Sequence, residues 1–193
     1  MKNWSARLAV ALLVSLAGCA SSPPQPELKA VPGDKMAIVN FVRLGYAASA
    51  VDTADVEVWD GPHFIGALPP GGLIQYEVEA GSHVFMGHSG NWSYATGDLQ
   101  AGKQYVLKAN IAPGFATNKV FLGVAKADDL RISIWLGELK RLPPAARQGA
   151  AGDSPKRAEA VEAMSALEAG RVRDVPQIGP ENALDRLPEP KAR

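Results

Sequence analysis

Turn-forming residues recur about every 8 to 12 residues across residues 36–125, and this spacing constrains the fold more than any other feature of the chain. Glycine-containing turns at Asp60-Gly61, Ala80-Gly81 and Ala101-Gly102 separate short runs rich in Val, Ile, Phe and Tyr. Residues of these types favour strands, and the runs are too short for ordinary helices. The spacing therefore predicts a small antiparallel β-sandwich or barrel.

The run Leu73–Glu79 has the clearest strand pattern. Within it, Ile74, Tyr76 and Val78 alternate with a glutamine and two glutamates. Because successive side chains of a strand point to opposite faces, we expect one face of this strand to be buried and the other to face solvent. No sustained helical periodicity precedes residue 127. The fold class predicted for the chain is mainly β.

Residues 128–142 fit two interpretations. Leu130, Ile132 and Ile134 alternate as in a strand, whereas a Trp and two later leucines suit one face of a helix. Asp128 or Asp129 would cap such a helix, and a pair of prolines follows it. We expect a helix that packs across the sheet, so the predicted sandwich domain covers residues 36–142.

The composition changes after Leu142, where large apolar residues become scarce and charged residues become denser. A linker is followed by one short helix, with Ser154 as N-cap and Gly170 as the stop signal. Its apolar stripe is thin, so it gains little from packing. The last residues look disordered. We therefore expect residues 143–193 to form a linker, a short helix and a disordered tail.

The charge balance and the cysteine content limit the function. The chain has 20 basic and 20 acidic residues, so its formal net charge is zero. A nucleic-acid-binding protein usually carries a basic face, so we expect no nucleic-acid partner. The only cysteine, Cys19, excludes an intrachain disulfide framework and a cysteine-rich zinc site. This single thiol needs its own explanation.

The N-terminus has the order of an export signal. Lys2 and Arg7 are followed by an apolar run over residues 8–16, and the small residues Ala17 and Gly18 come next. The apolar run is too short to cross a bilayer core about 30 Å thick as a helix. We interpret residues 1–18 as a signal peptide. An ordinary signal peptide with an incidental cysteine is the alternative.

The tetrapeptide Leu16-Ala17-Gly18-Cys19 resembles the lipobox of bacterial lipoproteins. The resemblance implies a diacylglyceryl group on the Cys19 sulfur, cleavage before Cys19 and N-acylation of the new terminus. Ala20 stands where an aspartate in that family favours the inner membrane, which implies an outer-membrane location facing the periplasm. Residues 19–35, with several prolines, are expected to be the lipidated cysteine and a flexible tether.

Part of the sandwich region has a recurring pattern of apolar residues and turn glycines: Val56–Gly61, Phe64–Leu68, Gly71-Gly72, Val78–Phe85 and Leu99–Tyr105. This pattern resembles PEGA-type and related bacterial lipoprotein domains of unknown function. The resemblance implies a transthyretin-like or carboxypeptidase-regulatory-like β-sandwich, and it says almost nothing about activity. The chain departs from the PEGA repeat at Val78–Gly81, where that repeat usually has a proline-containing turn.

The three histidines could support a metal site or a hydrolase only if they converge. His83 and His88 are separated by an odd number of positions, so on a regular strand they point to opposite faces. A bulge at Gly87 would bring them to the same face. We favour surface or turn histidines, also for His63, and predict no catalytic residue, no metal ligand and no cofactor.

Trp59, Asp60 and Trp92 are the candidates for partner binding. Trp59 has the opposite strand parity to Val56 and Val58, so it faces outward if those valines face the core. An outward tryptophan beside an aspartate could contact a partner or a glycan, and core packing is the alternative.

The function expected from these residues is a non-enzymatic binding or structural module of the cell envelope, anchored to the membrane through Cys19. Its partner would be an envelope protein or peptidoglycan. The alternative is a periplasmic metal-binding protein or hydrolase that uses His83, His88 and nearby acids.

Overall fold

The computed structural model describes residues 25–45, 54–112, 118–145 and 156–191. Cys19, the lipobox-like tetrapeptide and the capping residue Ser154 lie outside these ranges. None of the helices in the described part of the chain has the length and apolar character needed to span a bilayer.

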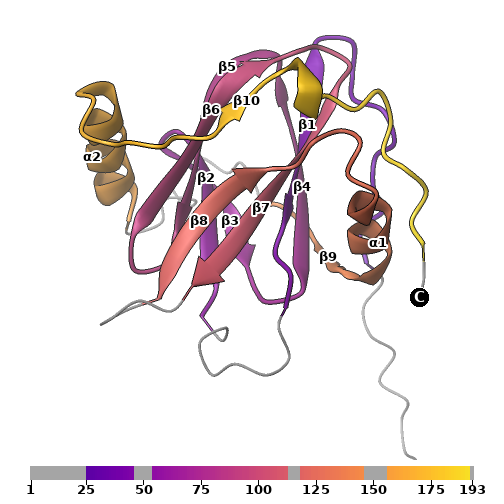
Figure 1. Ribbon diagram of the computed structural model, residues 1–193, viewed down its shortest axis with the longest axis horizontal. Helices are drawn as coiled ribbons and strands as arrows, with labels where there is room; N and C mark the ends of the chain where they lie inside the picture. Colours follow the sequence, from indigo (N-terminus) through magenta and orange to yellow (C-terminus); the bar gives the residue numbers. More distant parts are fainter. Residues whose placement is uncertain (1–24, 46–53, 113–117, 146–155, 192–193) are drawn as a thin grey trace, which may run out of the picture.

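The described residues form a sandwich of two five-stranded sheets (Figure 1). This architecture confirms the mainly β prediction. Sheet A has the order β8 (Lys119–Val124), β7 (Gln104–Ala112), β1 (Met36–Val42), β4 (Gly72–Glu79) and β9 (Lys140–Leu142). Sheet B has the order β10 (Gln177–Ile178), β6 (Trp92–Leu99), β5 (Gly81–His88), β2 (Val56–Asp60) and β3 (His63–Leu68).

The main core lies between the two sheets. In β4, Ile74, Tyr76 and Val78 belong to this core, whereas Gln75 and Glu77 are half-buried on the outer face of sheet A. The alternation in the sequence therefore identifies the buried face correctly. Phe41 of sheet A meets Phe85 of sheet B edge to face, with ring centroids 5.6 Å apart. Such aromatic pairs fix the two sheets against each other.

Local hairpins account for only part of the strand order. β1 pairs in parallel with β7, β4 with β9, and β6 with β10, while the other neighbours run antiparallel. The chain passes repeatedly from one sheet to the other, so strands far apart in sequence become neighbours. Turn signals report only the adjacent hairpins, and the parallel pairs therefore have no local signature.

The ambiguous segment contains both a helix and a strand. Helix α1 (Arg131–Glu138) packs on the outer face of sheet A, and β9 follows it directly. Ile132, Trp135 and Leu136 of α1 are buried against a cluster that includes Val42 and Leu73. The predicted helix across the sheet is confirmed.

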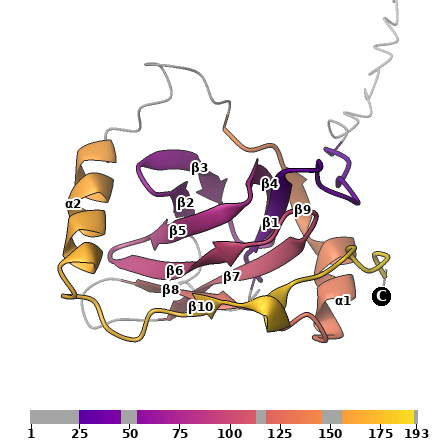
Figure 2. The ribbon, with the colours of Figure 1, turned by 90° about the horizontal axis from the view of Figure 1, so that it is seen from above.

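Helix α2 (Arg157–Glu168) covers the outer face of sheet B, on the opposite side of the sandwich from α1 (Figure 2). Its buried residues are only Ala160 and Ala163. Gly170, with φ of +66°, follows the helix in the left-handed conformation expected of a stop signal. The apolar stripe of α2 is as thin as the sequence suggests, yet the helix is packed.

The segment after α2 is ordered up to residue 191, and the expected disordered tail is wrong for these residues. It runs from α2 across sheet B to α1, as the yellow trace in Figure 1 shows. Ile178 enters the core between the sheets, and the backbone N–H of Lys191 donates to the Ser133 carbonyl at 3.0 Å. The tail backbone at Ile178 lies so close to β6 that only a glycine fits at position 97. A Cβ there would lie 2.3 Å from the Ile178 carbonyl oxygen.

Candidate functional site

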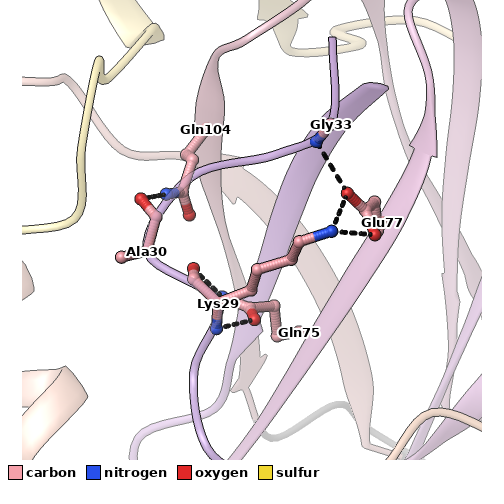
Figure 3. Close-up of polar contacts among 6 residues, drawn as sticks. All are labelled: Lys29, Ala30, Gly33, Gln75, Glu77 and Gln104. Carbon is pink, nitrogen blue, oxygen red and sulfur yellow. Dashed lines mark hydrogen bonds and ion pairs between the residues drawn. The ribbon is translucent and has the colours of Figure 1, made fainter. Parts of the chain in front are cut away.

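The N-terminal segment, residues 25–35, lies along the outer face of sheet A (Figure 3). The Gln75 side chain binds the backbone of Lys29 in both directions. The Lys29 N–H donates to Gln75 Oε1 at 2.6 Å, and Gln75 Nε2 donates to the Lys29 carbonyl at 3.2 Å. An amide side chain can thus replace a neighbouring strand, because it offers one donor and one acceptor.

Glu77 holds the same segment through charge. Its carboxylate accepts from the Lys29 ammonium at 2.6 and 2.8 Å and from the Gly33 backbone N–H at 2.9 Å (Figure 3). The hydrogen bond from Lys29 is the main cause that lowers the pKa of Glu77; burial opposes it, and the Gly33 N–H and the Lys29 charge lower the pKa further. The ionised form of Glu77 is therefore the one that binds the N-terminal segment.

A buried polar network continues the contact into sheet A. Gln104 is fully buried and its amide donates to the Ala30 carbonyl. Asn40 is also fully buried; it donates to the Tyr105 carbonyl at 3.2 Å and accepts from Gln75 at 3.0 Å. Buried amides without partners are costly, so these residues fix the position of the N-terminal segment.

The expected flexible tether is therefore shorter than the sequence suggests. Gln25 accepts from the Arg141 backbone N–H at 3.0 Å, and Leu28 packs against the cluster under α1. Residues 25–35 thus belong to the folded domain. The proline-rich composition of this segment does not indicate that it is part of the fold. The segment is held by side chains of distant strands and not by its own hydrophobic residues.

Replacing Glu77 with glutamine is expected to lower the free energy of unfolding by about 1 kcal/mol at neutral pH. The effect is modest because the Lys29 side chain is 51% exposed and water screens the pair. The folded-state pKa lies below the ordinary 4.5, so the stabilisation is complete above pH 4.5 and is lost as the pH falls through the folded-state pKa.

Urea denaturation of the full chain in detergent at neutral and acidic pH measures this difference. Glu79→Gln is the matched control, because Glu79 is exposed on the same strand and is expected to change stability by less. A difference between wild type and Glu77→Gln that persists unchanged at the lowest pH would contradict the assignment.

The three candidate partner-binding residues have different surroundings. Trp59 points away from the core that holds Val58, as its parity indicates, but it is 0% exposed because α2 covers it. Trp92 is half-buried, with its ring centroid 5.9 Å from that of Trp59. With α2 in place, Trp59 therefore offers no surface to a partner; the sequence could not show this cover.

Asp60 is engaged with His83 at one end of the main core. Asp60 Oδ1 lies 2.9 Å from His83 Nδ1, and the Tyr76 hydroxyl donates to Asp60 Oδ2 at 3.3 Å. His83 Nε2 lies 2.8 Å from the Glu79 carbonyl. A general base needs a ring nitrogen that can accept a proton from a nucleophile, and both nitrogens of His83 face oxygen acceptors. The arrangement fits a structural role.

His88 lies on the other face of sheet B. Its ring packs on Trp92 at 4.6 Å, and its Nδ1 is 3.3 Å from the Lys156 ammonium at the start of α2. Glu57 completes this group, which we call the His88 cluster (Glu57, His88 and Lys156). Burial and the neighbouring Lys156 charge lower the pKa of His88, although Glu57 opposes them.

The described residues contain no group of three or more His, Cys, Asp or Glu side chains that could hold a metal ion. His83 stacks on Phe85 of the main core, and His88 lies on the outer face with Trp92, so the odd offset does place them on opposite faces. His63 is exposed at the edge strand β3.

A shallow groove of about 570 Å³ lies where β5, β6 and β10 meet. Its polar wall includes Ser82, Thr96, Asp98 and Gln177, and Val84, Leu99, Ile178 and Pro180 are its apolar residues. The Ser82 hydroxyl donates to Asp98, and the Thr96 hydroxyl donates to Gln177 at 3.2 Å. No sequence motif marks this groove, because residues 177–180 of the tail complete a wall begun by β5 and β6.

Comparison with known proteins found no matching family model, no matching curated protein and no matching solved structure. The class that the fold defines is a mainly β sandwich protein with a helix on each outer face.

Proposed function

We propose that the chain is an outer-membrane lipoprotein that acts as a non-enzymatic binding or structural module of the cell envelope. The support is the order of the N-terminal residues: the charges of Lys2 and Arg7, a short apolar run, small residues and then Cys19. This is the order of a lipoprotein signal, and acyl chains on Cys19 would give stable anchoring, since two lipid signals suffice for it.

The docked N-terminal segment supports the proposal because it limits the distance between Cys19 and the folded domain. Cys19 and Gln25, the first described residue, are six residues apart. Even a fully extended chain of that length spans only about 20 Å. A lipidated Cys19 would thus hold the sandwich close to the bilayer surface, without a long flexible tether. Such a short connection suits a module that works on partners close to the membrane.

The partner we propose is an envelope protein or peptidoglycan. The groove between β5, β6 and β10 supports this choice, because its hydroxyl, carboxylate and amide groups can exchange hydrogen bonds with a glycan or a peptide. The rival function, a metal-binding protein or hydrolase, finds less support. It needs His83 and His88 to converge, and they lie on opposite faces of sheet B.

Cells grown with labelled palmitate are expected to label the wild-type protein and not Cys19→Ser, because a serine hydroxyl replaces the sulfur that would carry the diacylglyceryl group. The wild type should also be recovered with the outer membrane. The measurement is the label in the purified protein, together with its mass before and after processing.

Ser21→Ala is the matched control, since it changes a neighbouring residue and leaves the sulfur in place. It should keep the label and the processing of the wild type. Label and processing that survive in Cys19→Ser would overturn the proposed anchoring. An anchored protein found in the inner membrane would overturn the proposed location.

A further inference from the structure

The His88 cluster joins the start of α2 to sheet B. The Lys156 ammonium lies 3.1 Å from Glu57 Oε1 and 3.3 Å from His88 Nδ1. The second carboxylate oxygen, Glu57 Oε2, is buried without a hydrogen-bond partner and lies 3.7 Å from the same His88 nitrogen. One carboxylate and one ammonium group thus meet around a single ring nitrogen.

The contact with Lys156 favours one proton state of the ring. An ammonium group can only donate hydrogen bonds, so this contact is a hydrogen bond only when His88 Nδ1 carries a lone pair. In that state the imidazole is neutral, with its proton on Nε2. Burial of His88 and the Lys156 charge both favour this neutral form.

A second proton on His88 reverses the contact. Nδ1 then becomes a donor and can no longer accept from Lys156, and two positive groups stand 3.3 Å apart. The nearby acceptor without a partner is Glu57 Oε2. Protonated His88 would bind this oxygen, and the Lys156 side chain, which is 36% exposed, would move into solvent.

We propose that the His88 cluster is an acid-sensitive latch, and that protonation of His88 releases α2 from the outer face of sheet B. Release exposes the aromatic face that α2 covers, defined by Trp59, Phe64, Met86, Trp92 and Tyr94. The inference does not depend on the proposed lipid anchor, because it uses only contacts within the domain.

The other contacts of α2 set the balance between the closed and the released states. The buried residues of the helix, Ala160 and Ala163, are small, but Met164 and Leu167 also pack against the cluster that holds the fully buried Trp59 and Met86, so apolar burial favours the closed state. Trp59 Nε1 is buried without a hydrogen-bond partner in the covered state, which is a cost of keeping α2 in place. The Tyr94 hydroxyl donates to the Ala163 carbonyl at 3.1 Å, and it remains a contact in favour of the closed state.

The charged groups around His88 decide the direction of the pH effect. Glu57 of β2 and Glu159 of α2 favour the protonated ring, whereas burial and Lys156 of α2 oppose it and prevail. The pKa of His88 is thus lowered in the closed state and returns to about 6.5 when the helix leaves. Release therefore increases as the pH falls below 6.5, by at most about tenfold per pH unit for one proton.

Hydrogen exchange of the full chain in detergent, from about pH 7.5 to about pH 5, tests the latch. Protection of the α2 amides is measured relative to α1 in the same sample, which cancels the pH dependence of the intrinsic exchange rate. The ratio is expected to fall as the pH drops below 6.5. His88→Asn keeps an acceptor oxygen near Nδ1 but cannot titrate, so its ratio should stay constant. His63→Asn, at an exposed position, should behave as wild type.

Two results would overturn the latch: an α2-to-α1 ratio that does not change with pH in the wild type, or the same acid loss in His88→Asn. Lys156→Gln provides a second variant in case His88→Asn does not fold. Removing the ammonium should raise the pKa of His88 in the closed state toward 6.5, so the ratio should fall less with acid than in the wild type. A fall as large as that of the wild type, or larger, contradicts the proposal.

Discussion

Trp59→Ala is expected to lower the free energy of unfolding by about 3 to 5 kcal/mol, the range for removing a large buried aromatic side chain. Trp59 is fully buried between sheet B and α2, and it contacts Phe64 and Trp92 edge to face at 5.1 and 5.9 Å. Its removal leaves a cavity that the small residues of α2 cannot fill. Urea denaturation of the full chain in detergent measures the change.

Trp59→Phe is the control for this prediction. The indole N–H has no hydrogen-bond partner, so its loss removes no favourable bond, and only the difference in ring volume remains. We expect Trp59→Phe to cost clearly less than Trp59→Ala. A change below about 1 kcal/mol in Trp59→Ala would show that the side chain is not packed, and would restore its role as an exposed partner platform.

Ile178→Ala is expected to lower the free energy of unfolding by about 2 to 4 kcal/mol. Ile178 is 4% exposed and contributes to the core between the two sheets, although it comes from a short strand in the tail. Loss of this contact also weakens the pairing of β10 with β6, in which Gln177 and Ile178 face Thr96 and Gly97. Denaturation and hydrogen exchange of the tail amides measure both effects.

Gln177→Ala is the matched control, because Gln177 is exposed at the neighbouring position of the same strand. It should change stability by no more than about 0.5 kcal/mol, as a surface substitution does. Equal small effects of both variants would mean that the tail is disordered, as its composition suggests. A large loss in Ile178→Ala alone would establish that the tail belongs to the fold.

The sequence predicts those elements whose signal is local. The alternation in Leu73–Glu79 identifies the buried face of β4, and the parity of Trp59 gives its outward direction. The helix in residues 128–142 is found because an apolar face and end signals coincide. Each of these inferences needs only residues a few positions apart.

What the sequence does not predict depends on distant partners. The N-terminal segment is held by Gln75, Glu77 and Gln104, which lie far along the chain and have no feature that points to it. The apolar residues of the tail, among them Ile178, Leu184 and Leu187, are scattered without the period of a strand or a helix, so they make no local pattern. The cover over Trp59 is missed because Ala160 and Ala163 pack by being small, which gives α2 little amphipathic character.

The same contrast between local and distant residues explains which candidate sites the sequence predicts. Cys19 is recognised from neighbouring residues alone. The His88 cluster combines residues from β2, β5 and the start of α2, and the groove combines β5, β6 and β10. Only tertiary structure brings such groups together.

The docked N-terminal segment also determines how the domain would bear mechanical load. β1 lies in the middle of sheet A and follows this segment directly, so tension on the N-terminus would otherwise act on a central strand. With the segment docked, a pull would first have to break the Gln25 contact with Arg141 and the pairing of Lys29 with Gln75 and Glu77. These contacts would yield before β1 is stretched, and they could re-form once the force is removed.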